Sequence, residues 1–373
     1  MMIAADRPIQ RPTGARLLAL DAQGRINQLP RLRLVAELLR RGDLVVANDA
    51  ATLPASLAGV HLRSGAAIEV RLAGRASLAV DDIRCFSAVV FGEGDWRTLT
   101  EERPLPPPLL PGDVLQLGPL QARIERTLGH PRLVALRLAG TPDGIWAGIA
   151  RHGRPIQYAH LREPLALWDV WTPIAGEPVA FEPPSAGFVL DWQTLDEMRE
   201  RGIGFATLTH AAGISSTGDA ALDARLPFDE PYRIPAATAQ ALAATRAQGG
   251  RVIAIGTTVV RALEHAASRD GRVHAGEGLA DQRITAGTRL RAADAIVSGT
   301  HEPGASHYEL LRAFAREADL RRADAMLQAG GYRTHEFGDS VWIERARTSA
   351  SGTAARTRHR QAAVAAPALL RAV

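Results

Sequence analysis

The apolar positions of this chain change their spacing twice along its length. Residues 15–60 contain a strand-like run, a helical stretch and a second apolar run that ends in a polar turn. In the helical stretch the apolar residues lie three to four positions apart, at Leu34, Val35, Leu38 and Leu39. Residues 61–145 instead hold short alternating or β-branched runs separated by Gly, Pro and Asp. From residue 146 to 343, apolar runs again alternate with helical stretches.

This pattern predicts an α/β protein with an insertion. Strands that alternate with helices favour a mostly parallel sheet with flanking helices, whereas five short, closely spaced strands favour a small barrel or sandwich. We therefore expect residues 1–60 and 146–345 to form one α/β domain, interrupted by an inserted β-barrel domain at 61–145. Residues 346–373 are rich in Ala, Arg, Ser and Thr without an apolar period, which predicts a disordered basic tail.

Composition narrows the class of protein. A hydrophobic fraction of 46% and a charged fraction of 23% are typical of a globular protein with a core. The sequence shows no secretory leader and no membrane span, and its single cysteine, Cys85, can form no internal disulfide. We expect a cytoplasmic protein without a membrane partner. The net charge is +4 and every basic residue is arginine, which excludes lysine Schiff-base chemistry and is compatible with phosphate binding.

The clearest candidate site is the segment RVIAIGTTVVRALE, residues 251–264. A buried run stops at Gly256, and Thr257 and Thr258 open a helix that carries Arg261. The free backbone N–H groups and positive end of a helix start suit a carboxylate or a phosphate. An ordinary capped strand–turn–helix has the same pattern.

Three further candidate segments are turns that lie at the end of a predicted strand or at the start of a predicted helix. In FEPPSAGFVLD, the small residues Ser185, Ala186 and Gly187 follow Pro184 and permit a tight turn, which is also compatible with a plain loop. His210 and His301 each end a predicted strand, and ligands of open α/β sheets bind beyond the carboxyl ends of strands. The eleven histidines show no HxxxH or HxH spacing, so we expect no metal site.

Together these segments resemble the S-adenosylmethionine:tRNA ribosyltransferase-isomerase family of the queuosine pathway. The segment AIGTTVVRALE is nearly the family form, and PPSAG is similar to a family Pro-Thr-Ala-Gly turn with Ser185 in place of Thr. In THEPGAS, His301 and Pro303 match and Ser306 is the nearest hydroxyl to a family serine; in THAAG, His210 falls one place late. The early segment GDLVVANDAATLPASL matches at Gly42, Asp43, Asn48, Asp49, Pro54 and Ala55, and the closing FGDSVWI at Gly338 and Asp339.

The resemblance covers residues 15–343 and implies a fold, a reaction and a site. It implies an inserted β-barrel and transfer of the ribosyl group of S-adenosylmethionine to the aminomethyl-deazaguanine base of tRNA, with isomerisation, giving epoxyqueuosine in tRNA. A base must remove a proton beside the sulfonium, and His301 and His210 are its candidates; the other histidine or a carboxylate such as Asp49 is a candidate to protonate the departing adenine. The implied substrate-binding residues are Asn48, Pro184, Ser185, Ala186, Gly187, Gly256, Thr257, Thr258, Arg261 and Ser306. S-adenosylmethionine and tRNA are the expected partners of a monomer that uses no metal.

The chain also departs from the family pattern. Two family arginines are replaced by Ala51 and Ser56, a family histidine by Val189, and the segment RLPFDEPYRI lacks a second family histidine. These losses leave two alternatives open. One is a paralogous S-adenosylmethionine-using enzyme with another acceptor, and the other is a non-catalytic RNA- or nucleotide-binding relative.

Overall fold

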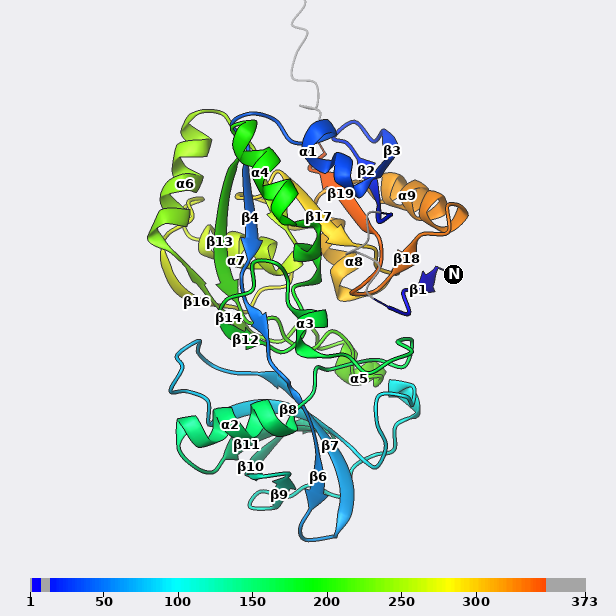
Figure 1. Ribbon diagram of the computed structural model, residues 1–373, viewed down its shortest axis with the longest axis vertical. Coiled ribbons are helices and arrows are strands. Elements are labelled where there is room, and N and C mark those ends of the chain that lie inside the picture. The colour runs from blue at the N-terminus through cyan, green and yellow to red at the C-terminus, as the bar shows by residue number, and fades with distance from the viewer. Residues whose placement is uncertain (1, 8–13, 347–373) are drawn as a thin grey trace, which may run out of the picture.

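The computed structural model describes residues 2–7 and 14–346 and consists of an α/β lobe and a β-barrel lobe stacked along the long axis of the molecule (Figure 1). The chain enters the barrel once and returns to the α/β lobe once, so the barrel is an insertion. The predicted basic tail lies outside the described residues, apart from Ala346. Within the described part of the chain, no helix is both long and apolar enough to cross a membrane.

A nine-stranded sheet forms the centre of the α/β lobe. Its strands lie in the order β16 (Gly276–Ala280), β14 (Glu230–Ile234), β13 (Gly204–His210), β4 (Leu44–Asn48), β15 (Val252–Ile255), β17 (Ala295–Gly299), β19 (Ser340–Glu344), β2 (Arg16–Leu20) and β3 (Ile26–Pro30). The four central strands β13, β4, β15 and β17 are parallel, as are β19 and β2. The remaining neighbours pair antiparallel, so the sheet is more mixed than the sequence suggested.

Helices cover both faces of this sheet, which explains why its central strands are apolar throughout. In β4, Leu44 and Val46 pack into one core together with side chains of α6 (Ala236–Ala247), α7 (Thr257–Ala266), α8 (Ser306–Leu311) and α9 (Glu317–Ala329). Val45 and Ala47 point to the opposite face and pack against α1 (Leu34–Glu37), α4 (Trp192–Glu200) and the 3₁₀ helix η3 (Ser185–Val189). Alternate residues of a strand face opposite sides, so a strand between two helical layers needs an unbroken apolar run.

The barrel has six strands and its own core. The closed order is β10 (Leu120–His130), β11 (Leu133–Leu138), β8 (Cys85–Phe91), β7 (Ala66–Gly74), β6 (Ser56–His61) and β9 (Val114–Leu117). Its first strand begins ahead of residue 61, and α2 (Pro142–His152) packs Ile145 and Ile149 into the barrel core. The predicted fold class, an α/β domain with an inserted barrel, is confirmed.

Short elements join the two lobes and complete the chain. Two small parallel pairs lie outside the main sheets, β1 (Ile3–Ala4) with β18 (Arg333–Thr334) and β5 (Ala51–Thr52) with β12 (Pro178–Ala180). The remaining short helices are η1 (Arg31–Arg33), η2 (Thr100–Glu102), α3 (Leu167–Val170) and α5 (Ala220–Asp223). The β5–β12 pair carries the chain into and out of the connection between the lobes.

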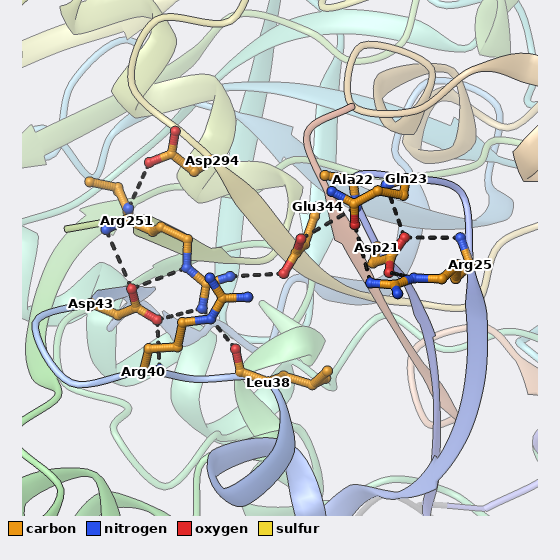
Figure 2. Close-up of polar contacts among 11 residues, drawn as sticks. Asp21, Ala22, Gln23, Arg25, Leu38, Arg40, Asp43, Arg251, Asp294 and Glu344 are labelled. Atoms are coloured by element: carbon orange, nitrogen blue, oxygen red, sulfur yellow. Dashed lines mark hydrogen bonds and ion pairs between the residues drawn. The ribbon is translucent and has the colours of Figure 1, made fainter. Parts of the chain in front are cut away.

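An ion-pair network closes the sheet edge at which the parallel strands begin (Figure 2). Arg251, directly before β15, contacts both carboxylate oxygens of Asp43 at 3.1 and 2.6 Å and donates to the carbonyl oxygen of Leu38 at 2.8 Å. It also contacts Glu344 of β19 at 2.8 Å. These charges neutralise one another, and a cavity lies at the opposite edge, where the parallel strands end.

Candidate active site

A cavity of about 310 Å³ lies beyond the carboxyl ends of β15 and β17. Its walls come from η3, the loop after β13, the start of α7, the loop before α8 and the first turn of α8. The lining residues include Glu182, Pro184, Ser185, Ala186, Gly213, Glu230, Gly256, Thr257, Thr258, Arg261, His301, Ser306 and His307. This is the edge at which ligands bind in open α/β sheets. Nine of the residues singled out from the sequence line it: Pro184, Ser185, Ala186, Gly256, Thr257, Thr258, Arg261, His301 and Ser306.

The start of α7 is shaped by Gly256. This residue adopts φ +95°, and a Cβ placed on it would lie 3.3 Å from the Cβ of Ala186. A larger residue would therefore be strained in its backbone and pressed against η3. No side chain caps α7, so the N–H groups of its first turn remain available to an anion in the cavity.

Arg261 lies one turn into α7 and is almost fully buried. Its guanidinium pairs with Glu230 of β14 and donates to the carbonyl oxygen of Ala280 in β16 at 2.7 Å. Glu230 also accepts from the N–H of Gly213 at 2.6 Å, and burial raises its pKa against the lowering effect of Arg261. The pair joins α7 to the edge strands and to the loop after β13, and so holds one wall of the cavity in place.

Two stacked imidazoles form another part of the wall. His301 follows β17 and His307 lies in the first turn of α8; their ring centroids are 4.5 Å apart. Burial lowers the pKa of His301 well below its usual value, and His307 and His335 lower it further. Burial also lowers the pKa of His307, against an opposing effect of Glu336. Both rings are therefore neutral at pH 7.

His210 and Asp49 do not line the cavity, although the sequence singled them out with His301. His210 is 0% exposed, its Nε2 lies 3.5 Å from Oε2 of Glu230, and neither of its ring nitrogens makes a hydrogen bond. Asp49 accepts a hydrogen bond from the hydroxyl of Thr209 at 2.8 Å. His210 shares a strand face with Leu208, whose neighbours in the core include α7, so its ring is packed behind Arg261 and Glu230. Burial, with Arg261 adding to it, lowers the pKa of His210 well below its usual value.

Asn48 and Gly187 also lie behind the cavity wall. The side chain of Asn48 accepts from the N–H of His210 and donates to its carbonyl oxygen, both at 2.9 Å, and so fixes the end of β13 to the end of β4. A Cβ on Gly187 would lie 3.0 Å from a methyl carbon of Thr172, which indicates close packing rather than ligand contact. Both residues support the walls that carry their neighbours.

Several polar residues of the cavity were not predicted from the sequence, among them Glu182, Glu230 and His307. Glu182 accepts from the hydroxyl of Tyr158 and from the N–H of Ser215 at 3.1 Å. Burial first, and Glu336 second, raise the pKa of Glu182 to about 7. Glu182 and His307 stand directly beside the segments PPSAG and THEPGAS, so a search of the flanking residues could have found them.

Comparisons with known proteins agree with this arrangement of segments. Residues 2–343 match the model of a family described as queuosine biosynthesis protein. The S-adenosylmethionine:tRNA ribosyltransferase-isomerase of Moorella thermoacetica is 30% identical, over 91% of this chain and 95% of that protein. The enzyme of the same name from Citrifermentans bemidjiense is 32% identical, over 91% and 96%. A solved S-adenosylmethionine tRNA ribosyltransferase from Thermotoga maritima aligns with a TM-score of 0.48 and 23% identity, over 91% of this chain and 96% of that chain. This chain belongs to the S-adenosylmethionine:tRNA ribosyltransferase-isomerase family of queuosine biosynthesis.

Proposed function

We propose that this protein transfers the ribosyl group of S-adenosylmethionine to the aminomethyl-deazaguanine base of tRNA and isomerises it, giving epoxyqueuosine in tRNA. The observation that carries the proposal is the cavity at the ends of β15 and β17, whose wall includes both the neutral imidazole of His301 and the uncapped start of α7. Its volume of about 310 Å³ is that of a small-molecule pocket. Family membership supplies the identity of the substrate, and the cavity supplies a place for it.

The start of α7 is suited to the carboxylate of the methionine moiety. Backbone N–H groups of a first helical turn and the positive helix end attract an anion. Gly256 and Ala186 are small enough to let the backbone approach the ligand closely, and the hydroxyls of Ser185 and Ser306 are additional hydrogen-bond partners. We assign this subsite to binding and orientation.

The reaction needs one group that removes a proton and one that delivers a proton. The sulfonium acidifies the ribose carbon next to it, and His301, which is neutral, can accept that proton. The departing adenine must be protonated, and Glu182 lines the cavity with a carboxyl group that hydrogen-bonds to Tyr158. We assign the acid to Glu182 in place of Asp49, because Glu182 lines the cavity and Asp49 does not. Methionine and adenine leave, and the rearranged ribosyl group stays on the base as an epoxide-bearing ring.

The tRNA must be bound by arginine, because the chain has no lysine. Two family arginine positions are lost: Ala51 of β5 is 4% exposed, and Ser56 of β6 donates a hydrogen bond to Glu69 of β7 at 2.8 Å. Exposed arginines near the junction of the lobes, Arg151 and Arg154, are the replacements that we propose.

A paralogous enzyme that uses S-adenosylmethionine on another acceptor is the second candidate, because Ala51 and Ser56 stand where the family has arginines. Incubation with S-adenosylmethionine and tRNA bearing the aminomethyl-deazaguanine base, followed by nucleoside mass spectrometry, separates the candidates. Epoxyqueuosine in the tRNA supports the main proposal. Release of adenine and methionine without a modified nucleoside supports the paralogue, and binding without turnover supports a non-catalytic relative.

We also propose that the protein acts in the cytoplasm, where tRNA is modified, and that it is a monomer. Every group that we assign to the reaction belongs to one chain and one cavity, so no second subunit is needed to complete the site. Light scattering of the purified protein should give a mass near 39.9 kDa. A mass twice as large would refute the monomer.

A further inference from the structure

Three potential metal ligands from distant parts of the chain meet next to the active-site cavity. His160 lies in the segment between α2 and α3, whereas His335 and Glu336 lie between β18 and β19. One ligand atom of each residue lies within 4.8 Å of the other two. Nε2 of His160 is 3.8 Å from Oε2 of Glu336, and the rings of His160 and His335 stack with centroids 4.5 Å apart.

Two features of this cluster have no explanation in the packing alone. Nε2 of His160 is buried and makes no hydrogen bond, although a buried polar atom normally has a partner. His335 has φ +66°, a left-handed conformation that no other non-glycine residue adopts in the described ranges 2–7 and 14–346. Residues in such strained conformations cluster at functional sites, because the surrounding structure must hold them there.

The backbone around His335 supplies that hold. Its N–H donates to the carbonyl oxygen of Thr300 at 3.3 Å, and its carbonyl oxygen accepts from the N–H of Gly338 at 3.0 Å. Thr300 directly precedes His301 of the active site. The strained turn therefore presents its imidazole to His160 and is hydrogen-bonded to the loop that carries the candidate base.

We propose that His160, His335 and Glu336 bind a divalent transition-metal ion such as Zn²⁺. Two imidazole nitrogens and one carboxylate oxygen form a donor set that zinc and its first-row neighbours accept, and three protein ligands leave further coordination positions open to water or substrate. Ligand bonds of about 2.0–2.2 Å require the donor atoms to move closer together than they are here, so the side chains must rotate when the ion binds. The proposal does not rest on the ribosyl-transfer proposal, and it replaces the sequence expectation that the chain holds no metal.

Metal binding is tested directly on the purified full-length protein after treatment with a chelator. Titration with Zn²⁺ by calorimetry, with the bound metal quantified by mass spectrometry, should give one ion per chain. His160→Ala, His335→Asn and Glu336→Gln should each weaken zinc binding by at least about 100-fold, since loss of a residue that only hydrogen-bonds to a metal ligand already costs roughly 10–100-fold. Absence of stoichiometric binding by the wild type would overturn the proposal.

Matched variants separate this site from other histidines and from unfolding. His274→Ala removes an exposed histidine that pairs with Asp270, and His359→Ala removes one near the C-terminus; both should bind zinc as the wild type does. His301→Ala should also keep its zinc, and loss of binding there would move the ion to the cavity and refute the assignment. Asn tolerates a left-handed backbone, so His335→Asn should unfold at the same temperature as the metal-free wild type or above it while losing zinc. A lower unfolding temperature in that variant would show that the strained turn is held by the imidazole itself, against the proposal.

Discussion

The imidazoles of His301 and His307 stack in the cavity wall with a centroid distance of 4.5 Å and an angle of 15° between their planes. Protonation of either ring is unfavourable, because each ring is desolvated and a positive charge on one would repel a positive charge on the other. His301 is thereby kept neutral and able to accept a proton.

Replacing His301 by alanine should lower kcat for formation of the modified nucleoside by about 100-fold or more, which is the usual contribution of a positioned general base. The affinity for S-adenosylmethionine should change little, because the start of α7 still binds the carboxylate. Single-turnover kinetics and calorimetry measure the two quantities. His274→Ala is the matched control on the exposed surface. An unchanged rate in His301→Ala would remove this residue from the mechanism.

The two candidate acids can be compared by conservative substitution. Glu182→Gln keeps the size of the side chain but removes its acidic proton, so kcat should fall by about 100-fold with intact substrate binding. Asp49→Asn should retain most of the activity, since Asp49 bonds to Thr209 behind the cavity. The reverse ranking of the two variants would restore Asp49 as the acid.

Gly256→Ala should destabilise the protein and weaken binding of S-adenosylmethionine. Its positive φ costs alanine about 1 kcal/mol, and the new methyl group presses on Ala186 at the ligand subsite. Gly249 also has a positive φ, +74°, but a Cβ there meets no atom within 4 Å. Gly249→Ala should therefore lower stability in urea unfolding by less than Gly256→Ala does, and it should leave affinity unchanged. Equal affinity in both variants would show that the start of α7 does not contact the ligand.

The buried His210 should make the fold sensitive to acid. Its pKa is depressed in the folded state, so between that value and about 6.5 the unfolded chain binds more protons, and stability falls as the pH falls through 6.5. The loss contributed by one such group approaches about 1.4 kcal/mol per pH unit. Urea unfolding at pH 7.5 and 5.5 should show a smaller difference for His210→Asn than for the wild type. An identical pH dependence would mean that His210 is protonated in the fold as easily as in the unfolded chain.

Arg151 and Arg154 should contribute to tRNA affinity through phosphates. Each substitution by alanine should weaken binding for any tRNA sequence and reduce the slope of log affinity against log salt by about one unit. Arg199 on α4 is exposed and paired with Asp196, and Arg199→Ala serves as the control. If the control weakens binding equally, the tRNA surface is not at the junction of the lobes.

Much of the fold could be predicted because its patterns are local. The unbroken apolar run of β4 and the alternating runs of the barrel strands indicate directly which of their side chains are buried. The antiparallel edges could not be predicted, since strand direction depends on how the connections pack rather than on the strand itself. The strand β16, with the sequence GEGLA, has too few apolar residues to be recognised as a strand.

The site was predictable to the extent that it is built from turns. Gly256 and the PPSAG turn carry their geometry in their sequence, and both line the cavity. His210 was misplaced because its position at the end of β13 does not reveal which face it points to or what α7 places over that face. The cluster of His160, His335 and Glu336 has no signature in spacing, because its parts come from segments that meet only when the chain returns from the barrel.

The most direct test traces the ribosyl group of S-adenosylmethionine to its product. S-adenosylmethionine labelled with ¹³C only in its ribose is incubated with the purified protein and tRNA that bears the aminomethyl-deazaguanine base. The tRNA is then digested and its nucleosides are analysed by mass spectrometry. The account predicts that the label appears in epoxyqueuosine and that unlabelled adenine and methionine are released in equal amounts. Consumption of S-adenosylmethionine with no label in the tRNA would contradict it.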